Sequence, residues 1–314
     1  MNKKSLLAAA ALLLGSSGSA QWQPAGDKIK TPWAEKVDPT CPLNEYPRPL
    51  VERARWKNLN GLWNYSIVPA GTPAGAYDGQ ILVPFAVESS LSGVGKRLGA
   101  ENELWYARTF VVPTDWSGDR ILLHFGAVDW KADVWVNDVQ VGSHTGGYAP
   151  FTFDITAALH RKGENTLKVR VWDPTERGKQ TSDPGGIWYT PVSGIWQTVW
   201  LEPVPQRYIA GLRTTPDIDR RTLRIEADVP DAGPNDRIEV AVMDGERTVP
   251  AGRGGRSGHA GRHEAVESRL AFPVRPAGNA QIRQGNGRRG EKLRGHAQVL
   301  DSPRRGRHRP AAAQ

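Results

Sequence analysis

The chain has 314 residues, a length that suggests about two domains, and a formal net charge of +8 at pH 7. Residues 251–314 hold 14 basic and 4 acidic side chains, whereas residues 1–250 hold 27 basic and 29 acidic ones. The basic character belongs to the tail, so composition excludes a nucleic-acid-binding role for the body of the chain. The single cysteine, Cys41, excludes an intramolecular disulfide and a C-x-x-C zinc or redox site.

The first twenty residues have the pattern of a secretory signal. Lys3 and Lys4 give a positive start, residues 6–14 form an apolar run, and residues 18–20 place small side chains before a cleavage point at Gln21. The apolar run is shorter than the about 20 residues that cross a bilayer. We therefore expect an exported protein, periplasmic or extracellular, with no membrane partner.

Short β-type segments separated by turns follow an arm that we expect to be extended over residues 21–45. Apolar and polar residues alternate in several of them, and Asn137-Asp138 is typical of a tight hairpin turn. Residues 61–205 contain no amphipathic pattern of three helical turns, so the sequence predicts an all-β sandwich over residues 46–205. The expected strands are 61–68, 80–83, 104–112, 120–125, 131–136, 140–143, 148–154, 166–172 and 198–204.

A second β-type series begins after residue 205. Its expected strands are 208–215, 222–229 and 237–243. An immunoglobulin-type sandwich has about seven strands, so residues 206–250 predict only the start of such a domain.

The sequence changes texture after Pro250. Residues 251–314 are rich in Arg, Gly, His and Pro and show no sustained apolar period, which predicts a disordered basic tail. One interpretation is an arm that binds anionic polymers. The other, which we favour, is translation in a shifted reading frame of a GC-rich gene.

Four ordered motifs carry a resemblance to a known family. They are V-W-V-N at 134–137, G-G-Y-x-P-F-x-F-D-I-T at 146–156, E-N-x-L-x-V-x-V at 164–171 and S-G-I-W at 193–196. Together they closely resemble the N-terminal sugar-binding jelly-roll domain of glycoside hydrolase family 2, the family of β-galactosidases, β-glucuronidases and β-mannosidases. The resemblance implies a galactose-binding-like jelly roll followed by an immunoglobulin-like domain.

Most residues of these motifs have a structural interpretation. Gly146-Gly147 is expected to supply a backbone with positive φ, and Asp154 and Thr156 to bond backbone amides at a strand end. Four tryptophans fit the interior of a sandwich: Trp130, Trp135, Trp172 and Trp200.

The segment 182–189 is the candidate sugar site. It combines Gly and Pro with the carboxylate of Asp183 and the rings of Trp188 and Tyr189, and an aromatic face next to a carboxylate suits a sugar. In the family that the chain resembles, this loop lies near the catalytic cleft. A structuring role for Asp183 is the alternative, and Glu88 is a weaker candidate sugar ligand.

The resemblance implies a parent activity, retaining hydrolysis of terminal β-linked glycosides, that uses two carboxyl groups on a (β/α)₈ barrel. The 109 residues after Pro205 are too few for such a barrel of about 250 residues, so we expect no catalytic residue and no activity of this chain alone. We expect a carbohydrate partner, no cofactor, no metal and no nucleic acid. A free-standing carbohydrate-binding module without hydrolase activity is the alternative function.

Overall fold

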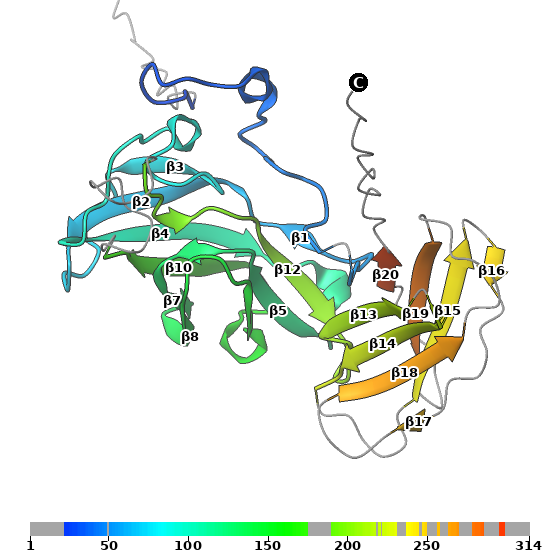
Figure 1. Ribbon diagram of the computed structural model, residues 1–314. Coiled ribbons are helices and arrows are strands. Elements are labelled where there is room, and N and C mark those ends of the chain that lie inside the picture. The colour runs from blue at the N-terminus through cyan, green and yellow to red at the C-terminus, as the bar shows by residue number, and fades with distance from the viewer. Residues whose placement is uncertain are drawn as a thin grey trace, which may run out of the picture.

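The computed structural model describes residues 22–48, 50–174, 190–217, 219–220 and 223–230 with their side chains. For the second half of the chain it also gives the backbone of the strands named below. The predicted signal, residues 1–20, and the candidate sugar residues Asp183, Trp188 and Tyr189 lie outside the described residues. Two β-sandwiches follow one another along the chain (Figure 1).

The first sandwich consists of antiparallel sheets. The six-stranded sheet has the order β3-β2-β4-β10-β7-β8, the four-stranded sheet β1-β12-β5-β9, and a small third sheet pairs β11 with β6. These strands are β1 (Lys57–Asn58), β2 (Gly61–Pro69), β3 (Gly79–Val83), β4 (Asn102–Val111), β5 (Arg120–Phe125), β6 (Val128–Asp129), β7 (Lys131–Val136), β8 (Val139–Thr145), β9 (Phe151–Asp154), β10 (Glu164–Trp172), β11 (Gly194–Ile195) and β12 (Val199–Val204).

The helical elements among the described residues are short 3₁₀ turns. They are η1 (Pro32–Lys36), η2 (Ser90–Ser92), η3 (Thr114–Trp116) and η4 (Thr156–Ala158). Strands and these short turns are the regular structure of the described residues, which confirms the all-β prediction. In this part of the chain no helix is long and apolar enough to cross a membrane.

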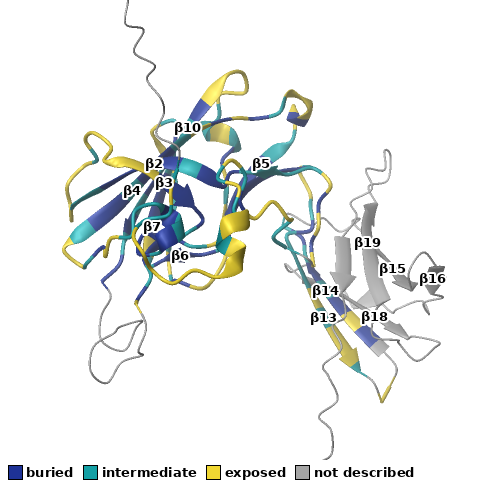
Figure 2. Cartoon of the chain, turned by 90° about the horizontal axis from the view of Figure 1, so that it is seen from above, coloured by how far each residue is buried: buried dark blue, intermediate teal, exposed yellow. Residues whose placement is uncertain are grey.

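The core lies between the six-stranded and the four-stranded sheet, where the buried residues concentrate (Figure 2). Period-2 alternation sends one set of side chains from each strand into this space. Trp63 and Tyr106 meet edge-to-face there, with ring centroids 6.3 Å apart, and the Trp63 indole donates to the Leu59 carbonyl at 2.8 Å. The large aromatic therefore buries its ring without leaving its N–H unpaired.

None of the four tryptophans assigned to the interior belongs to the core cluster between the two sheets. Trp200 is 1% exposed but shares its face of β12 with Glu202, and Trp130, Trp135 and Trp172 are only half-buried. Trp135 and Trp172 occupy the outward positions of β7 and β10, between core residues such as Val134 and Val171. The prediction was wrong for these residues because ring size indicates burial but does not say which face of a strand the ring occupies.

The hairpin and loop predictions of the motifs are confirmed. Asn137 and Asp138 both have positive φ, 49° and 65°, between β7 and β8, and Gly146 has φ 119°. The Asp154 carboxylate accepts from the Thr156 amide at 3.0 Å, and the Thr156 hydroxyl accepts from the Ile121 amide at 2.8 Å. These residues specify the connections between strands.

Two asparagines from separate motifs hydrogen-bond to each other. The Asn137 side-chain amide donates to Asn165 Oδ1 at 2.7 Å and to the Ala158 carbonyl at 2.8 Å. Asn165 Oδ1 also accepts from the His160 amide at 2.7 Å, and Asn137 Oδ1 accepts from the Thr166 amide at 2.9 Å. The pair thus joins the β7–β8 turn to the start of β10.

The second sandwich contains two four-stranded sheets, β13-β14-β18-β17 and β16-β15-β19-β20. After residue 250, β18 pairs with β14 and β19 pairs with β15. The sequence analysis expected no regular structure there, because the sequence lacks an apolar period. The frame-shift hypothesis and the domain boundaries stay predictions. The strands are β13 (Gly211–Asp217), β14 (Thr222–Asp228), β15 (Arg237–Asp244), β16 (Arg247–Val249), β17 (Arg256–Ser257), β18 (His263–Arg269), β19 (Gly278–Gly285) and β20 (Gly295–Gln298).

Replacing the buried amide in Asn165→Ala should lower the free energy of unfolding by about 2–3 kcal/mol, because several buried polar groups lose a partner. The matched control is Asp138→Gly, which keeps the positive φ and removes an exposed ion pair with Lys168, worth about 0–1 kcal/mol. Urea unfolding of both variants measures the difference. Equal effects of the two substitutions would contradict a structural role for the asparagine pair.

Candidate functional site

Ser193, the first residue of the S-G-I-W motif, ties three segments together at one end of the first sandwich. Its amide donates to Glu88 Oε2 at 2.9 Å, and its hydroxyl donates to Asp173 Oδ2 at 2.8 Å. Ser193 is fully buried, and Asp173 and Ser193 flank residues 175–189, the segment that contains the candidate sugar residues. The hydrogen bond between them therefore joins the chain before that segment to the chain after it.

Gly194 allows the chain to pass close to the core at this point. Its φ is 88°, and a Cβ atom there would lie 2.1 Å from the hydroxyl oxygen of Tyr106. That hydroxyl instead accepts a hydrogen bond from the Ile195 amide at 3.1 Å. Only glycine combines this φ with this approach.

The S-G-I-W and G-G-Y motifs meet at the same end. The Trp196 indole donates to the Gly147 carbonyl at 2.7 Å, and the Tyr148 ring lies edge-on to Trp196 with centroids 5.8 Å apart. Tyr148 is 63% exposed. A partly exposed aromatic pair suits the C–H face of a sugar. The sequence analysis did not single out this pair, because it assigned both motifs to the fold. The tyrosine of the G-G-Y motif was the signal in the sequence.

Glu88 is the one candidate sugar residue that the structure describes. It is 5% exposed, and burial raises the pKa of its carboxyl, while the hydrogen bond from the Ser193 amide acts in the opposite direction. This geometry makes Glu88 a residue that positions the backbone at Ser193. The sugar-binding roles of Glu88, Asp183, Trp188 and Tyr189 stay predictions.

The N-terminal arm holds the turn that carries Glu88. The Ala25 amide donates to the Ser90 carbonyl at 2.8 Å, and the Ser90 hydroxyl donates back to the Ala25 carbonyl at 2.6 Å. The Lys28 ammonium donates to the carbonyl of Glu88 itself. The arm thus stabilises the same end of the sandwich.

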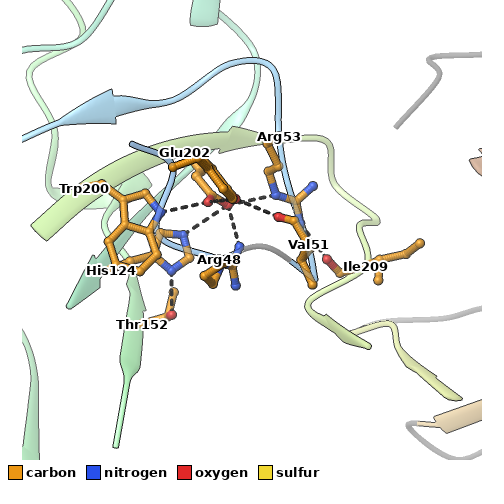
Figure 3. Close-up of polar contacts among 9 residues, drawn as sticks. Arg48, Val51, Arg53, His124, Thr152, Trp200, Glu202 and Ile209 are labelled. Carbon is orange, nitrogen blue, oxygen red and sulfur yellow. Dashed lines mark hydrogen bonds and ion pairs between the residues drawn. The ribbon is translucent and has the colours of Figure 1, made fainter. Parts of the chain in front are cut away.

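The largest group of buried charges surrounds Glu202 on β12 (Figure 3). Glu202 Oε2 accepts from Arg48 Nη2 and Arg53 Nε, both at 2.8 Å, and lies 3.3 Å from His124 Nε2. Glu202 Oε1 accepts from the Trp200 indole at 2.8 Å and lies within hydrogen-bonding distance of the Tyr46 hydroxyl.

The surroundings of Glu202 favour its charged form and the neutral form of His124. Burial opposes ionisation, yet the contact with His124 and the charges of Arg48 and Arg53 hold the pKa of Glu202 far below its usual range. Burial lowers the pKa of His124, with the arginines acting in the same direction against the pull of Glu202. The carboxylate is fully buried, so this cluster is structural.

No group of three or more His, Cys, Asp or Glu side chains within the described ranges could hold a metal ion. The His124 ring is hydrogen-bonded to the Thr152 hydroxyl and stacked on Trp200, with ring centroids 4.7 Å apart. These contacts explain the burial of His124 without a ligand.

Comparisons with known proteins show what much of the first sandwich is similar to. Residues 96–205 match the sequence model of "Glycosyl hydrolases family 2, sugar binding domain". A β-glucuronidase from Paenibacillus borealis is 34% identical over 138 residues, which cover 42% of this chain and 23% of that protein. A β-glucuronidase from Felis catus is 25% identical over 249 residues, which cover 67% of this chain and 38% of that protein.

Solved structures show the same fold. The β-glucuronidase of Bifidobacterium dentium, complexed with coumarin-3-O-glucuronide, gives a TM-score of 0.56 at 22% identity, over 78% of this chain and 47% of that one. The chain therefore spans less than half the length of these relatives.

Glu202→Gln should lower the free energy of unfolding at pH 7 by about 3 kcal/mol, because the buried Arg53 and the half-buried Arg48 lose their counter-charge. The unfolded chain binds more protons than the folded one, since both Glu202 and His124 have lowered folded-state pKa values. Stability should therefore fall as the pH drops below about 6.5 for His124 and below about 4.3 for Glu202.

Urea unfolding between pH 7.5 and 3.5 measures this dependence. Glu202→Gln should flatten the pH dependence of the free energy of unfolding below about pH 4.3. Glu164→Gln, at an exposed position, should leave this dependence unchanged. An unchanged acid slope in Glu202→Gln would contradict the assignment.

Proposed function

Because residues 96–205 match the sugar-binding domain of family 2 glycosyl hydrolases, we propose that the first sandwich is the sugar-binding part of an exported β-glycosidase of the β-glucuronidase type. The observation that carries the proposal is the meeting of the S-G-I-W and G-G-Y motifs at one end of the sandwich, beside both ends of the segment 175–189. The signal-like start of the chain supports export.

The chemistry of this end fits a sugar. Tyr148 and Trp196 offer aromatic surface there, and the segment 175–189 adds the carboxylate of Asp183 and the rings of Trp188 and Tyr189. Aromatic faces take the C–H side of a pyranose, and a carboxylate accepts hydrogen bonds from its hydroxyl groups. Ser193, Asp173 and Glu88 bind no sugar in this proposal but position the segment.

Sugar binding should depend on residues of the segment 175–189 and not on the charge of Glu88. We expect Trp188→Ala and Asp183→Asn each to weaken binding of 4-nitrophenyl β-D-glucuronide about tenfold, through lost stacking and a lost charged acceptor. Glu88→Gln keeps an acceptor oxygen for the Ser193 amide and should leave the affinity within about twofold. Isothermal titration calorimetry measures all three.

Trp33→Ala is the matched control, because Trp33 lies on the arm and is 70% exposed. Equal affinities of wild type, Trp188→Ala and Asp183→Asn would contradict the proposed site. A loss of affinity in Glu88→Gln as large as in Asp183→Asn would make Glu88 a direct ligand.

The 314-residue chain alone should not turn over 4-nitrophenyl β-D-glucuronide or the matching β-D-galactoside. Retaining hydrolysis needs two carboxyl groups about 5–5.5 Å apart, which this family mounts on a barrel of parallel strands and helices. The paired strands of the described chain are all antiparallel. Release of 4-nitrophenol by the purified chain, persisting through further purification at constant specific activity, would contradict this expectation.

A further inference from the structure

The start of the N-terminal arm lies against a turn at the sugar-binding end of the first sandwich. Residues 22–28, the strap, lie along residues 87–95, the turn. The Ala25 amide donates to the Ser90 carbonyl at 2.8 Å, and the Ser90 hydroxyl donates back to the Ala25 carbonyl at 2.6 Å. These bonds join segments that are 65 residues apart along the chain.

Two glycines of the turn leave room for the strap. Gly93 and Gly95 have φ values of 79° and 68°, which favour glycine. A Cβ atom on Gly93 would lie 3.0 Å from Trp22 Nε1, and one on Gly95 would lie 3.1 Å from the Ala25 Cβ. The surface of the turn therefore fits the strap closely at both positions.

Polar contacts and small surfaces hold the strap, without a core of its own. The Lys28 ammonium donates to the Glu88 carbonyl, but each of residues 22–28 is exposed or half-buried, and none belongs to the core cluster of the first sandwich. A segment with few buried apolar contacts opens at a lower free energy than the core strands. The strap therefore has two accessible states, docked and released.

The turn connects the strap to the candidate sugar site. At Ser193 it holds both backbone groups: Glu88 Oε2 accepts from the Ser193 amide at 2.9 Å, and the Val87 amide donates to the Ser193 carbonyl at 3.4 Å. The Ser193 hydroxyl donates to Asp173, on the other side of the segment 175–189. A displacement of the turn therefore moves the anchor of that segment.

We propose that the strap is a positioning element of the sugar site, so that docking of the strap and binding of a sugar favour each other. This role rests on the proposed sugar-binding function and adds to it a segment that touches no sugar. The docked strap holds the turn, and the turn holds Ser193. Because coupling between two sites is reciprocal, a sugar that prefers the docked form must also stabilise the docked strap.

Hydrogen exchange of the full chain, with and without saturating 4-nitrophenyl β-D-glucuronide, tests this coupling. Exchange of the Ala25 amide, which bonds to the turn, should slow about fivefold when the glucuronide is bound. The Ala34 amide is the internal control, because it donates to the Thr31 carbonyl within the arm at 3.0 Å. Its exchange should not change. A merely structural contact would leave both amides unaffected by the ligand.

Variants test the same coupling from the side of the sugar. Lys28→Met and Ser90→Ala each remove a bond between strap and turn, and each should weaken glucuronide binding about fivefold in calorimetry. Lys28→Arg keeps a donor for the Glu88 carbonyl and should restore the affinity. Lys30→Met is the matched control, because the Lys30 ammonium donates only to the Lys28 carbonyl among the described residues, at 3.4 Å. It should bind as wild type does.

Two results would overturn the coupling: unchanged Ala25 exchange in the glucuronide complex, or wild-type affinity in Ser90→Ala, which keeps every charge. A loss of affinity confined to Lys28→Met would make Lys28 a direct partner of the sugar carboxylate and overturn the strap's role. The wild-type exchange decides the question even if a variant fails to fold. No glucuronide binding by wild type would contradict the proposed function as well, whereas binding with unchanged exchange would contradict the strap alone.

Discussion

A single buried carboxylate is the constraint on which the arrangement of this protein depends. Glu202 has no exposed surface, yet it stays ionised because Arg48 and Arg53 reach it from the segment before β1. A buried charge without such partners would cost several kcal/mol, so the segment 46–53 must lie across the outward face of the four-stranded sheet. Arg53 also donates to the Ile209 carbonyl, at the beginning of the second sandwich. One ion cluster therefore joins the segment before β1, the jelly roll and the beginning of the second sandwich.

The same stretch of chain links this cluster to the candidate sugar site. Ser193 anchors one end of the segment 175–189, Gly194 and Ile195 form β11, and β12 follows and carries Glu202. Ile209 then packs in the small core of the second sandwich with Leu223 and Ile225. β11 and β12 occupy much of the short stretch between the polar anchor at Ser193 and the start of the second sandwich. The candidate sugar site and the Glu202 cluster therefore depend on the same short stretch of chain.

The sequence predicted the parts of this structure that depend on local pattern. β5 and β7 match their expected bounds, because β5 is a short apolar run and apolar residues alternate in β7. Asn137-Asp138 forms its turn because both residues tolerate positive φ. The Glu202 cluster could not be predicted, since its arginines lie 154 and 149 residues away along the chain. A glutamate inside an otherwise apolar strand, β12, was the signal in the sequence. The outward placement of Trp135 likewise depends on strand face, which ring size does not reveal.

The most direct test of this account is a double-mutant cycle between Arg53 and Glu202. The free energy of unfolding is measured by urea for wild type, Arg53→Met, Glu202→Gln and the double variant. If the buried pair organises the junction, the effects are strongly non-additive, with a coupling energy of about 2 kcal/mol or more. Additivity within about 0.5 kcal/mol would show that the two side chains contribute independently and would contradict the central role of Glu202.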